Sequence, residues 1–486
     1  MKDNLFKSFM KFSYGSWVGL ILGLATTMLT TRLLPPEAFG KVSMFDLFLQ
    51  VGMIITIFGT DQSFVRFFYE EEPSKRGALL YNSLRLPVIT TSMVLVILVV
   101  WYKPITLFLI GRVDFNFAIW IAIGIIAQLL FRYGQLVIRM QQKGNLYSLL
   151  QIFRQVFNLV FILLLFYTIG SRFEVLIYSR VITLILVVIV AIYFGKQFWS
   201  VQNLKIKDVK HSQSEIFRFG APFVLTIFIT WLFESFDKIA LRQWSDFNEL
   251  GLYAAAMRLV ALVLVLQSTF STFWTPVAYE KFESNPEDKS FFRYISTVIA
   301  FAMFLVAIGS IAGKDVIVML LGNDYKKAAS IMPFLVFMPI FYTISETTVI
   351  GINFYKKTKW HILIAVIACV VNIIGNWLLV PNYGAIGASL STAFAYIIFF
   401  TLRTQISLKF YKVKYPLVRI YFMALLVSGY AFYSIFSTSI LINMVLGLIV
   451  TAILILIFYK DLLYVFKNRK FIFGRNNYLE TGDENE

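Results

Sequence analysis

Charged side chains inside apolar stretches are the residues of this 486-residue chain that could do chemistry. Arg258 is the foremost of them. It follows Gly251 by seven residues, which at about 1.5 Å each places it roughly 10 Å inside an apolar helix. An intramembrane charge costs ~2.5–3.5 kcal/mol on insertion scales, so it needs a partner, water or a function. Since a guanidinium can neutralise an anion through two parallel hydrogen bonds, we expect Arg258 to bind an anionic group, with an ion pair to a neighbouring helix as the alternative.

Four carboxylates lie in similar surroundings, at Asp46, Glu234, Asp237 and Glu346. A carboxylate in an apolar wall has a raised proton affinity, so Asp46, Glu234 and Asp237 are candidates to exchange a proton or a sodium ion. The alternative is structural, because Glu234 and Asp237 share one helical turn with Lys238 and could pair with it. By the same counting, Asp46 lies about 9 Å inside its helix and could face Arg258.

The elements that carry these charges are apolar stretches long enough to cross a bilayer. A hydrocarbon core of ~30 Å needs about 20 apolar residues of helix, and 59% of the chain is hydrophobic, with a mean hydropathy of +0.75. These values predict an all-α polytopic membrane protein with about 14 transmembrane helices. The expected spans are 12–32, 39–62, 78–100, 115–137, 146–168, 174–195, 216–241, 250–274, 291–312, 329–352, 361–380, 384–405, 417–436 and 438–459.

The formal net charge of +17 would suggest nucleic-acid binding in a soluble protein. Here the basic residues follow the topology instead. The N-terminus, every second link and the C-terminus hold 30 of the 44 Lys and Arg, whereas the intervening links hold 10. This asymmetry matches the positive-inside rule, so we expect both termini to be cytoplasmic and no nucleic-acid partner.

Landmarks of the first half recur in the second half at nearly constant offsets. Phe12–Gly15 answers to Phe217–Gly220 at an offset of 205, and Gly40 answers to Gly251 at 211. Six helices per repeat predict two lobes related by a pseudo-two-fold axis along the membrane normal, followed by two extra helices. The expected division is an N-lobe at 1–195, a cytoplasmic linker at 196–215, a C-lobe at 216–410, two helices at 411–460 and a cytoplasmic tail at 461–486.

Three segments resemble a known family. They are Lys11–Gly15 (KFSYG), Arg32–Gly40 (RLLPPEAFG) and Asn372–Ala388 (NIIGNWLLVPNYGAIGA). Together with the layout of about fourteen spans, they resemble the Wzx-type O-antigen and polysaccharide flippases of the multidrug/oligosaccharidyl-lipid/polysaccharide exporter superfamily. The resemblance implies a V-shaped, two-lobed fold whose central cavity is lined chiefly by helices 1, 2, 7 and 8.

The resemblance also implies a function. The chain would move an undecaprenyl-diphosphate-linked oligosaccharide from the cytoplasmic to the outer leaflet of the bacterial inner membrane by alternating access. Membrane lipid would be a partner, as could a polysaccharide polymerase and a chain-length regulator. No cofactor is expected beyond a coupling proton or sodium ion.

The anionic group for Arg258 would then be the diphosphate. Arg85, Arg154 and Arg180 fall in helices 3, 5 and 6, which the resemblance assigns to the body of a lobe, so we expect them mainly to snorkel or to pack. Arg66 and Arg32 sit at helix ends, where interfacial roles are expected. Arg66, Arg32 and Arg85 remain secondary candidates for contact with the headgroup.

Two other functions compete with this one. A cation-coupled multidrug exporter of the same superfamily would share the fold but have a more apolar cavity. A membrane enzyme acting on the same lipid carrier would need outer acid-base residues, but the outer links are short and no nucleophile, metal cluster or phosphate-binding loop is evident. We therefore expect no catalytic residues and no metal site.

Overall fold

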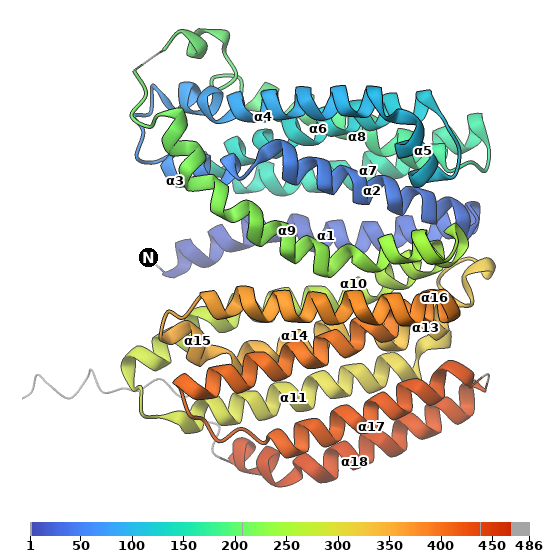
Figure 1. The fold of residues 1–486 in the computed structure, drawn as a ribbon. Helices are drawn as coiled ribbons and strands as arrows, with labels where there is room; N and C mark the ends of the chain where they lie inside the picture. Colours follow the sequence, from blue (N-terminus) through green and yellow to red (C-terminus); the bar gives the residue numbers. More distant parts are fainter. Residues whose placement is uncertain (1, 207, 438, 468–486) are drawn as a thin grey trace, which may run out of the picture. The chain divides into compact units, whose positions relative to one another are not determined.

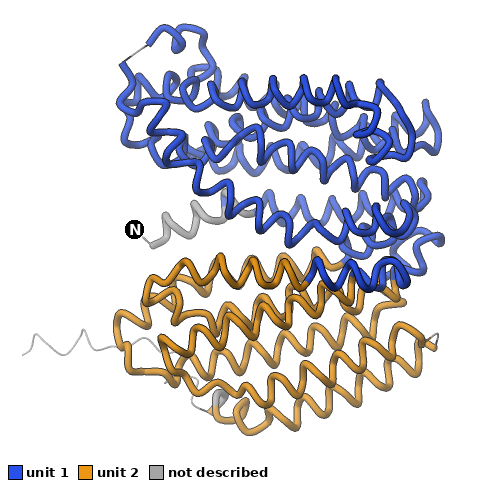
Figure 2. Tube along the Cα trace, viewed as in Figure 1, with its two compact units in different colours: residues 1–259, 318–328, 372–388 blue, residues 260–317, 329–371, 389–486 orange. Residues whose placement is uncertain are grey.

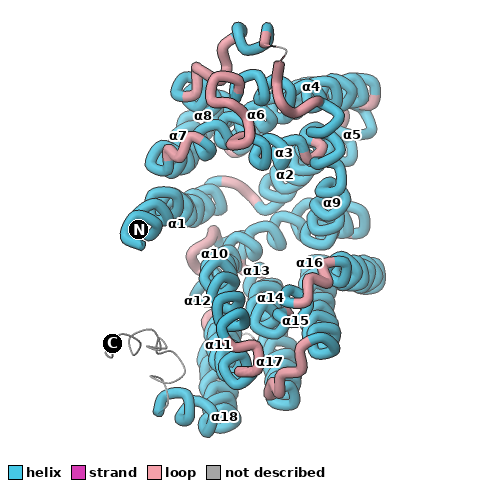
Figure 3. Tube along the Cα trace, turned by 90° about the vertical axis from the view of Figure 1, so that its left-hand side faces the viewer, coloured by secondary structure: helices cyan, strands magenta, loops and turns pink. Residues whose placement is uncertain are grey.

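The computed structural model describes residues 2–206, 208–437 and 439–467. Helices make up 86% of the structure, and no strand occurs in these three ranges (Figure 3). The all-α class predicted from the sequence is confirmed. Residues 468–486, which hold most of the predicted tail, lie outside the described residues.

The chain forms two compact units (Figure 2). Unit 1 comprises residues 1–259, 318–328 and 372–388, and unit 2 comprises residues 260–317, 329–371 and 389–486. The division into two lobes at 195, 215 and 410 stays a prediction of the internal repeat.

The helices of unit 1 are α1 (Lys2–Leu33), α2 (Pro36–Ile57), α3 (Thr60–Phe67), α4 (Arg76–Val100), α5 (Tyr102–Ile110), α6 (Phe115–Met140), α7 (Gly144–Ile169), α8 (Glu174–Phe194), η1 (Val201–Lys205), α9 (Gln213–Trp244), the first part of α10 (Phe247–Ser284) and η2 (Asn323–Tyr325), of which Figure 1 labels α1 to α10. Unit 2 contains the rest of α10, α11 (Lys289–Ala312), most of α12 (Lys314–Val318), α13 (Ala328–Leu335), α14 (Phe337–Thr348), α15 (Ile350–Phe354), most of α16 (Lys359–Phe410), α17 (Leu417–Phe436) and α18 (Ile440–Lys467).

Thirteen helices in the described ranges are long and apolar enough to cross a membrane. One of them, α16, has 52 residues and loses helical geometry at Gly384, whose φ of 51° and ψ of −130° suit glycine. Since about 20 residues suffice for one crossing, the two arms of α16 can each span the bilayer. They correspond to the predicted spans 361–380 and 384–405, so the chain is a multi-pass membrane protein with the expected number of crossings.

The start of α2 follows its sequence closely, but its end does not. Pro36 stands in the first turn, and Glu37 forms an ion pair with Lys41 at 2.6 Å. We expected the helix to continue to residue 62. Instead, Phe58 and Gly59 adopt left-handed backbone conformations, which end α2 at Ile57 and allow α3 to begin at Thr60 as a separate helix.

The first turns of α2 and α10 touch through two glycines. A Cβ atom added to Gly40 would overlap the carbonyl oxygen of Phe247, and one added to Gly251 would overlap the carbonyl oxygen of Pro36. Both Pro36 with Phe247 and Gly40 with Gly251 are separated by 211 residues, the offset that the sequence repeat predicts for this link. The contact is therefore reciprocal, with each copy of the motif placing its glycine against the other copy.

Packing within each unit fixes the helices that carry charge. In unit 1, α7 packs against α1 and α8, α6 packs against α8, and α2 contacts α4, α6 and α9. In unit 2, α11 packs against α14, α17 and α18. There the buried amide of Asn443 donates to the carbonyl oxygen of Ile311 at 2.9 Å, which ties α18 to the end of α11.

Candidate functional site

A polar cavity of about 240 Å³ lies among the membrane-spanning helices of unit 1. Helices α2, α6, α7, α8 and α10 contribute its walls. The lining residues are Asp46, Leu49, Gln50, Gln128, Arg154, Gln155, Asn158, Arg180, Thr183, Leu184 and Arg258. Three guanidinium groups thus face one cavity together with a single carboxylate.

Two of these arginines lack an acidic partner. Arg154 and Arg258 are exposed and form no ion pair in the ranges that the structure describes. The Arg154 guanidinium lies 5.4 Å from the centre of the Phe131 ring, a cation–π contact that offsets only part of its lost hydration. Arg258 interacts electrostatically with both Arg154 and Arg180. The cavity therefore concentrates positive charge.

The third arginine is neutralised. Arg180 of α8 forms an ion pair with Asp46 of α2, and the two side chains are 29% and 20% exposed. We expected that Asp46 could face Arg258. Both line the cavity, but Asp46 pairs with Arg180 instead, because α2 contacts α8 directly. This pair leaves the cavity with a net excess of two positive charges.

Neutral amides complete the polar wall. Gln50, Gln128, Gln155 and Asn158 line the cavity, and the Asn158 side-chain oxygen accepts a hydrogen bond from the Ser179 hydroxyl at 3.4 Å. Amide groups both donate and accept hydrogen bonds. The wall can therefore contact hydroxyl groups as well as anionic oxygens.

A buried carboxylate lies elsewhere in unit 1. Asp237 of α9 is 3% exposed and accepts hydrogen bonds from the Tyr253 hydroxyl at 2.5 Å and from the side-chain amides of Asn372 and Asn376 at 3.1 and 2.7 Å. Its donors come from α10 and from the part of α16 that belongs to unit 1. Asn372 therefore hydrogen-bonds from α16 to α9.

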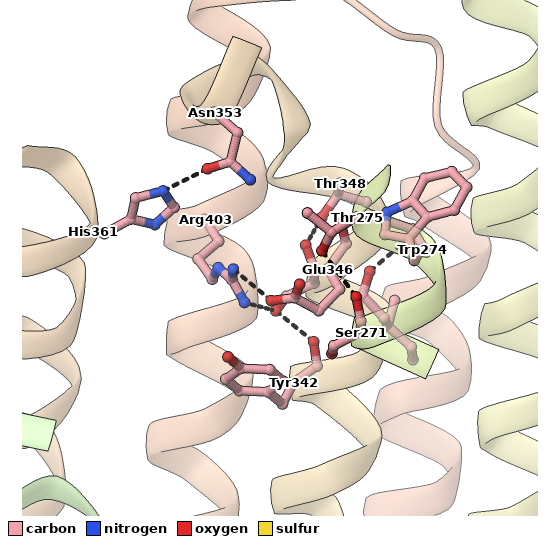
Figure 4. A network of polar contacts seen from close by, with 12 residues as sticks. Ser271, Trp274, Thr275, Tyr342, Glu346, Thr348, Asn353, His361 and Arg403 are labelled. Carbon is pink, nitrogen blue, oxygen red and sulfur yellow. Dashed lines mark hydrogen bonds and ion pairs between the residues drawn. The ribbon is translucent and has the colours of Figure 1, made fainter. Parts of the chain in front are cut away.

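Unit 2 buries a charge pair of its own (Figure 4). Arg403 of α16 donates to the carboxylate of Glu346 at 2.7 Å and to the hydroxyl of Ser345 at 2.6 Å. The rings of Tyr342 and Phe399 lie 5.2 and 5.1 Å from the guanidinium. This pair joins α14 to α16 and leaves no excess charge.

The remaining predicted residues lie away from the polar cavity. Arg66 pairs with Glu70 at the end of α3, and Arg32 is exposed in the last turn of α1. Glu234 is exposed on α9 and, within the described ranges, forms no ion pair with Lys238. Arg85 lines a second cavity between α4, α6 and the first turn of α9.

Sequence reasoning missed Arg154 and Arg180 as cavity residues. A depth count along a helix gives the level of a side chain in the membrane but not the face on which it lies. A signal for the face was present, since Arg154 and Asn158 on α7, and Asp46 and Gln50 on α2, are polar residues four positions apart. Residues at that spacing share one face of a helix, so these pairs predict a polar stripe.

Comparison with known proteins adds the family. Residues 6–282, more than half of the chain, match the polysaccharide biosynthesis protein family. The chain belongs to this family. No curated protein sequence matches it.

Solved structures share the fold. A structure titled "Lipid II flippase MurJ, inward closed conformation" aligns with 93% of this chain and 99% of its own at 18% identity, with a TM-score of 0.69. A multidrug resistance MATE family transporter of the MOP superfamily, in its inward-facing conformation, aligns with 84% of this chain and 99% of its own at 14% identity and a TM-score of 0.61. The chain thus has the fold of this superfamily, as the resemblance implied.

Proposed function

We propose that this protein is a flippase for an undecaprenyl-diphosphate-linked oligosaccharide, an O-antigen or capsular repeat unit, and carries it from the cytoplasmic to the outer leaflet by alternating access. The observation that carries the proposal is the polar cavity, with three arginines and one carboxylate among membrane-spanning helices. Uncompensated charge at such depth is expensive, and an anionic headgroup would neutralise it. Membership in the polysaccharide biosynthesis family and the fold shared with a lipid II flippase support the same function.

Different residues of the polar cavity would contact different parts of the substrate. Arg258 and Arg154, which lack acidic partners, are placed to donate to the oxygens of the diphosphate. The Asp46–Arg180 pair joins the parts of the wall that come from α2 and α8. The amides of Gln50, Gln155 and Asn158 offer hydrogen bonds to sugar hydroxyls, while the prenyl tail stays in the lipid. Arg66 and Arg32 lie outside this arrangement.

The charge distribution of the links supports an orientation of the chain in the membrane. The basic excess on alternate links supports cytoplasmic termini for a protein of the bacterial inner membrane. The headgroup would then enter from the side where lipid-linked glycans are made. A polysaccharide polymerase and a chain-length regulator are the partners that would act on the flipped product.

A coupling ion would act at Asp237. Of the three carboxylates considered, Asp237 is buried and accepts hydrogen bonds from neutral side-chain amides, whereas Asp46 is paired with Arg180 and Glu234 is exposed. A proton or a sodium ion at this carboxylate would neutralise it and change its bonds to α10 and α16. In proteoliposomes, the Asp237→Asn variant should transport at a rate that no longer responds to an imposed proton or sodium gradient. A wild-type response in that variant would remove Asp237 from this role.

The flippase proposal is tested with Arg258→Gln and, as a matched control, Arg66→Gln. In cells lacking the native protein, Arg258→Gln should fail to relieve the accumulation of lipid-linked glycan. In vitro it should lower transport of the undecaprenyl-diphosphate-linked oligosaccharide about tenfold or more, because a hydrogen bond to a charged group contributes about 1.5–3 kcal/mol. Arg66→Gln should behave as wild type.

The multidrug exporter is the competing function, because a MATE transporter shares the fold. It predicts drug hypersensitivity on deletion without any accumulation of lipid-linked glycan. That result would reject the flippase, whereas full transport activity in Arg258→Gln would keep the flippase and remove Arg258 from the headgroup site.

A further inference from the structure

Unit 1 contains a second and larger cavity, of about 880 Å³, whose lining is largely apolar. It lies between α4, α6, the connector after α8 and the first turn of α9. Its lining residues are Thr60, Tyr81, Asn82, Leu84, Arg85, Leu86, Val88, Ile89, Leu129, Leu130, Trp199, Leu204, Gln213, Ser214, Ile216 and Phe217. None of them lines the polar cavity, so the proposed headgroup site does not explain this space.

Two polar groups stand in this apolar lining without the partners they would normally have. Arg85 forms no ion pair in the described part of the chain. With the amide of Gln213 turned so that its oxygen faces the guanidinium, that oxygen accepts from Arg85 at 2.7 and 3.0 Å, which leaves the positive charge unneutralised. The indole N–H of Trp199 is buried and has no hydrogen-bond partner among the residues that the structure describes. The cavity therefore contains a cation without an anionic partner and a hydrogen-bond donor without an acceptor, within the described residues.

The level of these groups in the bilayer suits a lipid headgroup. Arg85 lies nine residues after the start of α4, about 14 Å along the helix, and helical side chains point back towards the N-terminus. Its guanidinium thus reaches the first residue of α9, at the same end of the spanning helices as Trp199 and η1. Val88 and Ile89, 55% and 53% exposed, continue the cavity away from that end.

The volume suits a hydrocarbon chain. An apolar cavity of about 150 Å³ holds a benzene molecule of six carbons, so a chain of about 16 carbons needs roughly 400 Å³. The cavity exceeds this volume. An amphiphile with an anionic head beside Arg85 and a hydrocarbon chain along α4 would fill the apolar space and satisfy both polar groups.

We propose that this cavity binds an anionic membrane phospholipid, with its phosphate at Arg85, an ester oxygen at the indole N–H of Trp199 and one acyl chain against Val88, Ile89 and Leu130. Such a lipid joins the α4–α6 pair to the connector that leads into α9. This site is independent of the proposed transport function.

The test uses the full-length protein, delipidated in detergent and then mixed with phosphatidylglycerol or phosphatidylcholine. Native mass spectrometry counts the bound lipids, and thermal unfolding reports their effect. The wild type should prefer phosphatidylglycerol and unfold at a higher temperature when it is bound. Arg85→Gln should lose about fivefold of that preference, the effect of one basic side chain at an anionic headgroup, whereas Arg66→Gln, with the same change of charge elsewhere, should keep it.

A second variant separates the cavity from the charge. Leu130→Trp should fill the space and reduce the binding of both phospholipids, with a cooperative thermal unfolding transition as the measure that the variant is folded. Unchanged phosphatidylglycerol preference in Arg85→Gln would overturn the proposal. So would unchanged lipid counts in a folded Leu130→Trp variant, or displacement of phosphatidylglycerol by stoichiometric undecaprenyl phosphate, which would assign the cavity to the carrier lipid.

Discussion

The polar cavity of unit 1 and the Glu346–Arg403 network of unit 2 show two ways of keeping arginine among membrane-spanning helices. In unit 2, Arg403 is 7% exposed and has a carboxylate, a hydroxyl and two aromatic rings around it. In unit 1, Arg154 and Arg258 are exposed to a cavity and form no ion pair with a carboxylate in the described ranges. A fully paired charge holds helices together, whereas an unpaired one in a cavity has capacity left for a ligand.

The largest expected effect comes from removing the paired arginine. Arg403→Gln leaves the carboxylate of Glu346 buried without its cation, a change that typically destabilises a protein by about 3–5 kcal/mol. Arg258→Gln removes a charge that has no partner and should leave stability unchanged or raise it. Thermal unfolding of both variants in detergent measures the contrast. Equal destabilisation by both would mean that Arg258 has a structural partner, and the distinction between the two regions would fail.

The next effect concerns the one pair within the polar cavity. Asp46→Asn and Arg180→Gln should each lower transport about tenfold, since each leaves a charge unpaired among spanning helices and costs at least ~1–3 kcal/mol. The exchange Asp46→Arg with Arg180→Asp should recover part of the loss. The exchange of Asp46 with Arg258 should recover none, because the ion pair joins α2 to α8. Recovery by the second exchange instead would show that Asp46 and Arg258 are the functional pair.

A smaller effect is expected at Asp237, which shares features of both regions, being buried but held by neutral donors. Tyr253→Phe removes a hydrogen bond to a carboxylate and should lower the free energy of unfolding by about 2 kcal/mol. Asn376→Leu removes a second donor and should add to that loss. Wild-type stability in Tyr253→Phe would show that this hydroxyl contributes nothing to the site.

The smallest effect is at the start of α6, where a charge is paired outside the spanning segments. Asp114 caps α6 through the backbone amide of Phe117 at 3.0 Å and pairs with Arg112 at 2.8 Å. Burial raises the pKa of Asp114, but these hydrogen bonds and the Arg112 charge outweigh it and lower the pKa overall. Asp114→Ala should cost about 1 kcal/mol, and Asp114→Asn much less.

The pH dependence of that difference follows from the lowered pKa. The ionised Asp114 stabilises the fold above the unfolded-state pKa of about 3.9, and this contribution is lost as the pH falls through the lower folded-state value. Thermal unfolding of wild type and Asp114→Ala should therefore differ at pH 6 and converge below about pH 4. A difference that persists in acid would contradict the ionised cap.

Apolar length predicts the spans well, because each helix must match the same hydrocarbon thickness. The predicted spans 361–380 and 384–405 fit the two arms of α16, and the turn at Gly384 lies between them. Apolar length does not predict the helix ends that are set by backbone conformation. Gly59 was the one sequence signal for the end of α2, while the stacking of Phe58 on Phe217 of α9, with ring centroids 5.6 Å apart, joins segments far apart in the sequence.

The candidate site was predicted in part for a related reason. Charge and depth identify Arg258 and Asp46, both of which line the polar cavity. They do not show which face of a helix meets which neighbour, so Arg180 was expected to pack within a lobe and Asp46 to face Arg258. The same holds for Arg85. Its depth made it a candidate for contact with the headgroup, but it lines the apolar cavity and not the polar cavity.

The reciprocal glycines at the start of α2 and α10 bear on how such a chain could arise. In an ancestor made of two identical six-helix subunits, this crossing would bring each glycine against the other subunit's copy of the same turn, so any side chain added there would intrude twice. After fusion of two such genes, either half could acquire its own charges. The crossing could not diverge in the same way, because two main chains already occupy the room that any larger residue would require.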